Sequence, residues 1–154
     1  MIQRIQSLYL LVAAALTAVA LFAPLAWFGG DAGEFTLRAF SLTTAAGEPV
    51  QPTPYMGLLL ALSCALPLAT IFLFRRRMLQ IRLCAVEGVL LLGSLAMETV
   101  YYFLSRRVFS ELDFGLQTLR PAAALPLAAL VFVVLAARAV FRDEVLVRTA
   151  DRIR

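Results

Sequence analysis

The chain contains no histidine and no lysine, and it has only two cysteines, Cys64 and Cys84. Without histidine it lacks the commonest zinc ligand and the usual axial ligand of haem, so we expect no metal site and no cofactor. The two cysteines belong to different apolar stretches and different depths, so we expect free thiols rather than a disulfide. All fourteen basic residues are arginine, and most of them flank apolar stretches, which argues against nucleic acid as a partner.

Apolar residues make up 62% of the 154 residues and are concentrated in four stretches. Each is close to the ~20 residues that a helix needs to cross ~30 Å of hydrocarbon. The segments between them are too short for a second domain. The sequence therefore predicts an all-α membrane protein, a single domain over residues 1–154 built as a four-helix antiparallel bundle. The predicted helices cover residues 7–28, 55–74, 83–104 and 122–141.

The arginines predict the orientation of the bundle. With the N-terminus inside, ten arginines lie in the inner segments and four in the outer ones, Arg38, Arg106, Arg107 and Arg120. The positive-inside rule then places both termini in the cytoplasm. We expect four inner arginines to contact lipid headgroups: Arg75, Arg76, Arg77 and Arg82.

The outer segments, residues 29–54 and 105–121, contain a strand pattern. Apolar and polar residues alternate over residues 35–43, with a change of phase that suggests a bulge. The alternation over residues 112–116 predicts its pairing partner, so the two outer loops form a small extracytoplasmic β element. The prolines that follow residue 47 predict an irregular return to the membrane.

Glu87 and Glu98 are the only acidic residues inside the apolar stretches. Eleven residues at ~100° each make about three turns, so both carboxyls lie on one face of the third helix, together with Leu91 and Ser94. A charge in the bilayer interior costs at least ~2.5 kcal/mol, which makes such residues candidates for function. A carboxyl near a helix end can instead reach the interface without any function.

Two structural roles are predicted for these carboxyls. Glu87 and Arg138 lie at similar depth on neighbouring helices, so we expect an ion pair between them. Glu98 is expected to face the bundle interior, with Ser94 and Ser63 as its nearest hydrogen-bonding groups.

The C-terminal tail, residues 142–154, continues the last helix with charges of both signs. Its arginines suit anionic headgroups, whereas its acidic residues favour a docking role. The candidate docking residues are Arg142, Asp143, Glu144, Arg148, Asp151 and Arg152.

Three segments carry a resemblance to a known family. The opening MIQRIQSLYL, the YYF that closes the third stretch and the DEVLVRTADR of the tail resemble the uncharacterised bacterial family catalogued as domain of unknown function 4293. The resemblance spans the whole chain. It implies a four-helix protein of the inner membrane of Gram-negative bacteria, and it implies no activity.

These observations favour a non-enzymatic accessory or scaffolding subunit of a larger membrane assembly, in contact with lipid and with a membrane protein partner or a second copy of the chain. A small transporter or proton relay based on Glu87 and Glu98 is the alternative. We expect no enzyme and no catalytic residue, because the chain has no histidine base and no nucleophile beside a basic partner in the sequence.

Overall fold

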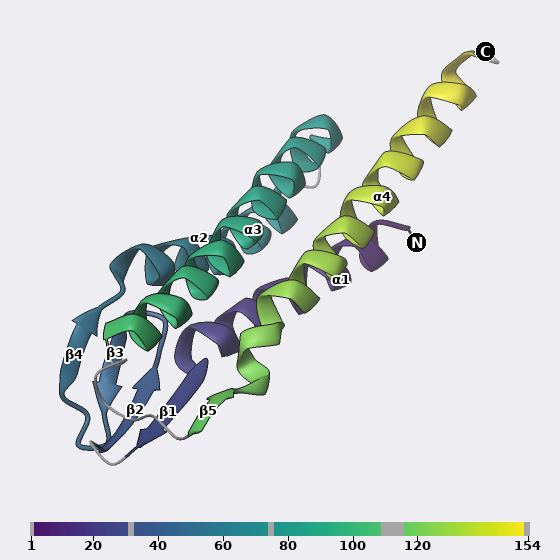
Figure 1. Ribbon diagram of the computed structural model, residues 1–154. Helices are drawn as coiled ribbons and strands as arrows, with labels where there is room; N and C mark the ends of the chain where they lie inside the picture. The colour runs from purple at the N-terminus through teal and green to yellow at the C-terminus, as the bar shows by residue number, and fades with distance from the viewer. Residues whose placement is uncertain (1, 31–32, 74–75, 109–115, 153–154) are drawn as a thin grey trace.

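The computed structural model describes residues 2–30, 33–73, 76–108 and 116–152, which form four long helices and one five-stranded antiparallel sheet (Figure 1). All four helices are long and apolar enough to cross a membrane, as the sequence predicts. The helices are α1 (Ile2–Phe22), α2 (Pro54–Phe72), α3 (Arg77–Val108) and α4 (Leu125–Arg152). The strands are β1 (Ala26–Gly30), β2 (Gly33–Leu37), β3 (Ser41–Thr44), β4 (Pro49–Pro52) and β5 (Leu116–Leu119), and a short 3₁₀ helix, η1 (Pro121–Ala124), precedes α4.

Each helix of the bundle packs against two others. Helix α1 contacts α2 and α4, and α3 contacts the same two. The sheet lies at one end of the bundle, which we call the sheet end, while the start of α1, the end of α4 and the neighbouring ends of α2 and α3 lie away from it, at the termini end (Figure 1). The arrangement is the antiparallel bundle expected from the sequence.

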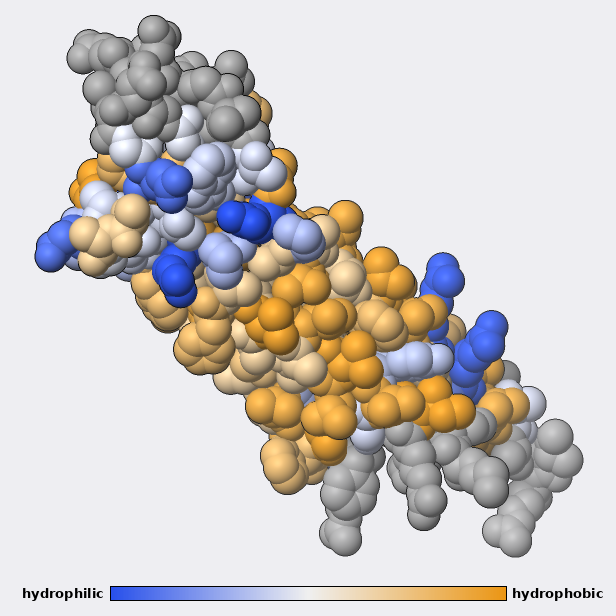
Figure 2. Space-filling model, turned by 90° about the horizontal axis from the view of Figure 1, so that it is seen from below, coloured by the Kyte–Doolittle hydropathy of each residue, from blue (hydrophilic) through white to orange (hydrophobic). Residues whose placement is uncertain are grey.

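The outer surface of the helices is apolar. Large side chains are exposed on every helix, among them Leu8, Phe72, Val89 and Leu127. Figure 2 shows hydrophobic residues as a broad band across the molecule, with hydrophilic residues gathered toward its ends. Water-soluble proteins rarely expose apolar patches of this extent, whereas a bilayer covers them.

The end of α1 differs from the prediction. Helix α1 ends at Phe22 rather than at residue 28, and Pro24 follows, where a continuing helix would lose a backbone donor. Trp27 and Phe28, predicted to be helical, belong to β1. The other limits also shift: α3 runs beyond the predicted 83–104 at both ends, whereas α4 begins at Leu125 rather than at 122 and continues into the tail to Arg152, as the sequence predicts. At ~1.5 Å per residue their lengths of ~48 Å and ~42 Å exceed the hydrocarbon thickness.

Helix α2 carries a proline in its interior, and α1 accommodates it. Pro54 occupies the first turn, where its missing N–H has no cost, but Pro67 lies inside the helix. Pro67 has no N–H to donate to the carbonyl of Ser63. The Thr17 hydroxyl of α1 lies 3.4 Å from that carbonyl and 3.0 Å from the Ala13 and Ala14 carbonyls of its own helix, so its one proton is shared between the two helices.

The strands lie in the order β4-β3-β2-β1-β5, all antiparallel. The prediction of a strand within residues 35–43 is confirmed, since β2 and β3 form a hairpin with Leu37 opposite Leu42. The phase change within it is a tight turn, in which the Arg38 N–H donates to the Ser41 carbonyl at 2.9 Å, and not a bulge.

Two further predictions about the outer segments are wrong. The proline-rich return contains a strand, β4, instead of being irregular. The second outer segment does supply a strand, β5, but β5 pairs with β1, with Ala26 opposite Leu119, instead of with β2 or β3. Of the predicted partner residues 112–116, only residue 116 lies within the described part of the chain.

One face of the sheet packs onto the ends of the helices. Phe28, Leu37 and Leu42 are buried there, and the Phe28 ring lies 5.5 Å from the ring of Tyr102 on α3. Phe40 packs over Gly57 of α2 so closely that a Cβ at that position would overlap the ring. The sheet is therefore fixed to the bundle by packing.

Candidate functional site

A line of buried polar side chains runs along α3, and we call it the polar seam. Its positions are spaced by three, four or seven residues, so they share one helix face turned toward the inside of the bundle. Only Leu91 interrupts this face with a fully buried apolar side chain. The seam consists of Gln80, Cys84, Glu87, Ser94, Glu98 and Ser105.

Helices α1 and α2 add polar groups to the interior, whereas α4 adds none among its buried residues. Gln6 and Thr17 of α1 are buried, as are Ser63 and Thr70 of α2. The Gln80 side-chain amide donates to the Thr70 carbonyl at 3.1 Å, which ties the start of α3 to the last turn of α2. The buried residues among the described side chains of α4 are Pro126, Ala129, Val133, Ala136 and Val140.

The carboxyl group of Glu87 has no partner. Its side chain is 1% exposed, and neither carboxyl oxygen has a hydrogen-bond partner within the described chain. The same holds for one oxygen of Glu98, Oε1, for the Ser63 hydroxyl and for the Gln6 side-chain nitrogen. Folded proteins pair the large majority of buried polar groups, because each unpaired one costs about 1–3 kcal/mol. A concentration of them in one bundle interior calls for a functional explanation.

The predicted ion pair between Glu87 and Arg138 is wrong. Arg138 is exposed and lines an open groove, whereas Glu87 is enclosed. The buried residues on either side of Arg138 in the sequence, Ala136 and Val140, explain this. A residue two positions away is turned by ~200°, so the face that buries Ala136 and Val140 turns Arg138 outward.

Glu98 lies in the interior, as predicted, at the sheet end of the seam. Its side chain is 6% exposed. The predicted hydrogen bonds to serine are absent from the described residues: the Ser94 hydroxyl donates to the Leu91 carbonyl of its own helix at 2.8 Å, and the Ser63 hydroxyl has no partner. Along α3 the two glutamates are separated by 11 residues, or ~16 Å.

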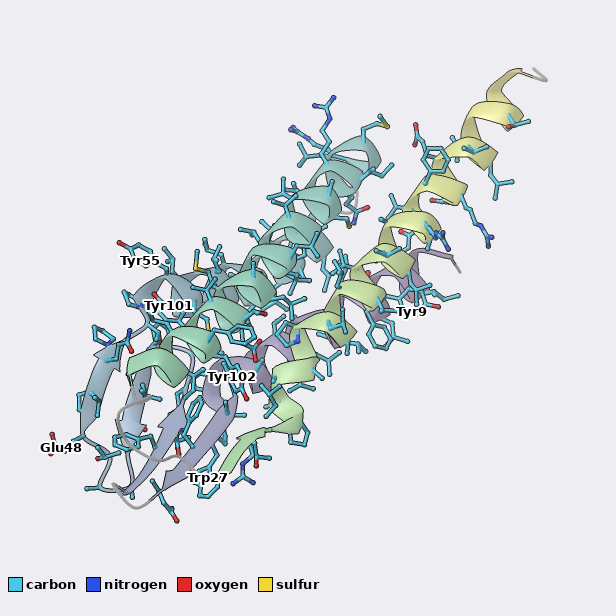
Figure 3. The ribbon with its side chains drawn as sticks, in the orientation of Figure 1. Tyr9, Trp27, Glu48, Tyr55, Tyr101 and Tyr102 are labelled. Atoms are coloured by element: carbon cyan, nitrogen blue, oxygen red, sulfur yellow. The ribbon has the colours of Figure 1, made fainter. Side chains whose placement is uncertain are left out.

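A cavity of about 250 Å³ adjoins Glu98. It lies between α3, β5 and η1, close to the position of Tyr102 that Figure 3 labels near the sheet. Its walls are mostly apolar. Two of the lining residues carry an ionisable group, the carboxyl of Glu98 and the phenol of Tyr102. The lining residues are Leu95, Glu98, Thr99, Tyr102, Phe103, Leu119 and Ala123.

The remaining predicted residues lie at the termini end. Arg76 and Arg82 are exposed near the start of α3, as headgroup contacts require. Arg75 and the side chain of Arg77 are not among the residues that the structure describes. The tail continues α4 to Arg152. Arg142 is exposed, and Asp143 and Glu144 each take part in an interaction of their own. The side chains of Arg148, Asp151 and Arg152 also lie outside the description.

The described cysteine and acidic side chains do not form a cluster that could bind a metal ion. Both cysteines are free, as predicted, and the Cys64 thiol lies 3.7 Å from the Ala14 carbonyl. Within the described part of the chain, no three acidic or cysteine residues lie close enough together to hold a metal ion.

The sequence identified only part of the seam. Gln80, Cys84 and Ser105 lie on the same face as the glutamates, and extending the three-and-four spacing in both directions would have found them. Thr17 and Gln6 carry no such signal, because an isolated polar residue in an apolar stretch does not reveal which way it faces.

The sequence model of the family described as Domain of unknown function (DUF4293) matches residues 2–153, so the chain belongs to that family. The resemblance noted in the sequence is thereby confirmed. No curated protein matches the chain.

Proposed function

We propose that this member of the DUF4293 family is a multi-pass membrane protein that relays protons through its bundle by means of Glu98 and Glu87. The observation that carries the proposal is the pair of buried carboxyls on one face of α3, with three of their four oxygens buried and unpaired. Intramembrane carboxyls that face a bundle interior are typical of proton pathways.

The structural alternatives to a functional role do not account for Glu87. A carboxyl that reaches the interface would be exposed, and Glu87 is 1% exposed. A carboxyl held for stability would have a partner, and both of its oxygens lack one among the described residues. An unpaired buried group lowers the stability of the fold. A functional role therefore explains the Glu87 carboxyl better than a stabilising role does.

The route follows the seam. Glu98 is reached from the cavity at the sheet end, and Glu87 lies ~16 Å further along α3, with Ser94 between them. The distances between these groups are longer than one hydrogen bond. Water molecules that enter the interior would therefore complete the chain of donors and acceptors. Each carboxyl forms an O–H bond as it takes up a proton on one side and breaks that bond as it releases the proton on the other; no substrate is converted, so the proposed role is transport rather than catalysis.

Proton flux into liposomes tests the proposal. The purified chain is reconstituted with a pH-sensitive dye inside, and a potassium diffusion potential drives protons inward. Glu98→Gln and Glu87→Gln keep the shape of the side chain and remove its titration, so each should lower the flux at least ~10-fold, as general acid–base groups do. Glu48→Gln, at an exposed carboxyl in the β3–β4 turn, is the matched control and should leave the flux unchanged. Equal flux in wild type and Glu98→Gln contradicts a relay.

The sheet supports a second candidate function, that of an accessory subunit. Its edge strand β5 pairs with β1 on one side only, and Leu119 at its end is 56% exposed. An edge strand accepts a further strand from another chain. The partner would be a membrane protein or a second copy of this chain. Cross-linking from a cysteine at Thr118 tests this candidate, since it should trap a partner in membranes, whereas a cysteine at Glu48 should not.

A further inference from the structure

The termini end of the bundle contains an open groove between α3 and α4. It has a volume of about 420 Å³ and is lined by Ile81 of α3 and by Ala137, Arg138, Phe141 and Arg142 of α4. Three of these five residues are apolar and two are arginines. The groove is separate from the polar seam, because Glu87 and the other seam residues do not line it.

Its two arginines lie on one side of α4. Arg138 and Arg142 are four positions apart, which places them one turn and ~6 Å apart on the same face. Both are exposed, and neither has an ion pair or hydrogen bond to another described residue. The nearby acidic residues Asp143 and Glu144 have interactions of their own. The groove therefore presents two positive charges that the described chain does not neutralise.

The walls of the groove distinguish between anionic occupants. Ile81, Ala137 and Phe141 offer an apolar surface, and Phe141 is 59% exposed. A free phosphate would bind the guanidinium groups and leave these apolar walls in contact with water. A phospholipid contacts both the guanidinium groups and the apolar walls, with its phosphate against the arginines and an acyl chain along the apolar wall.

We propose that this groove binds an anionic phospholipid, with its phosphate held between Arg138 and Arg142. A zwitterionic lipid carries a cationic group that the arginines repel, so a net negative headgroup is selected. The bound lipid touches Ile81 on one side and Phe141 on the other, and it therefore joins α3 to α4 at the depth where a Glu87–Arg138 pair was expected and is not formed.

Native mass spectrometry of the detergent-solubilised full chain measures this binding. Phosphatidylglycerol is compared with phosphatidylcholine of the same acyl chains. Each arginine near an anionic surface contributes roughly fivefold in affinity, so Arg138→Gln with Arg142→Gln should weaken phosphatidylglycerol binding by about 30-fold. The phosphatidylcholine affinity should stay within about twofold. Arg120→Gln is the matched control, since Arg120 is an exposed arginine at the sheet end that does not line the groove.

A further variant tests the groove itself. Ala137→Leu fills part of the hollow and keeps both charges, so it should weaken phosphatidylglycerol binding several-fold. Unchanged affinity in Ala137→Leu overturns the proposal, as does an equal loss in Arg120→Gln, because either result means that charge alone attracts the lipid. Competition by soluble glycerol phosphate at concentrations similar to the lipid also overturns it, because the acyl chain would then contribute nothing. Size-exclusion profiles confirm that each variant is folded.

Discussion

Replacing Glu87 with methionine tests whether its buried carboxyl is a cost to stability. Methionine has a similar length and volume and no polar group to satisfy, so the substitution opens no large cavity. Both carboxyl oxygens lack a partner in the described chain, and an unpaired buried polar group costs about 1–3 kcal/mol. We therefore expect Glu87→Met to raise the free energy of unfolding by about 1–3 kcal/mol. For a chain of this length that corresponds to a rise in Tm of roughly 2–12 °C.

Thermal unfolding in detergent, followed by circular dichroism, measures this change. Glu48→Met, at the exposed turn, is the control and should stay within ~0.5 kcal/mol of wild type. Glu87→Gln should also remain close to wild type, because the amide would be as unpaired as the carboxyl. A loss of more than ~1 kcal/mol in Glu87→Met refutes the reasoning, since it would mean that the carboxyl makes stabilising hydrogen bonds.

Three other predictions follow from the fold. In a double-mutant cycle, Glu87→Gln and Arg138→Gln should be additive within ~0.5 kcal/mol, since no ion pair joins them; a larger coupling energy in unfolding experiments would restore the pair. Gly57→Ala should destabilise the protein by about 1–3 kcal/mol because the new Cβ overlaps the Phe40 ring, and Phe40→Ala in the same chain should recover most of the loss; thermal unfolding of both variants checks this. A cysteine at Glu48, with the native cysteines replaced, should react with an impermeant maleimide on intact cells if the sheet end faces outward; labelling only after lysis would reverse the orientation.

The four spans were predictable because each is a continuous apolar run of sufficient length. Their ends were not. Trp27 and Phe28 are as apolar as the helix before them, and only the pairing of β1 with β2 and β5 makes them a strand. Pairing with residues about ninety positions away leaves no local pattern. The alternation that revealed β2 and β3 was local, and for that reason it was recognised.

The carboxyl site was predictable in part for a similar reason. The 11-residue spacing between Glu87 and Glu98 fixes their common face through helix geometry alone. Matching depths suggested Arg138 as a partner, but depth does not fix the direction in which a side chain points. Helical phase gives that direction only once the buried face of α4 is known: Ala136 and Val140 mark it in the structure, and Arg138 lies ~200° from the first of them.

The position of β1 between β2 and β5 has a consequence for biogenesis. Strands β1 to β4 leave the ribosome as one continuous meander, before α2 is made, whereas β5 emerges only after α3. Until then the edge of β1 that β5 later occupies has no partner strand. The last strand to arrive closes that edge, and the N–H of Arg120, which donates to the Leu25 carbonyl at 2.9 Å, secures the closure directly before α4 begins. The sheet is therefore complete only when the residues directly before the fourth span are in place, and a chain that stops before residue 116 leaves one edge of β1 without a partner strand.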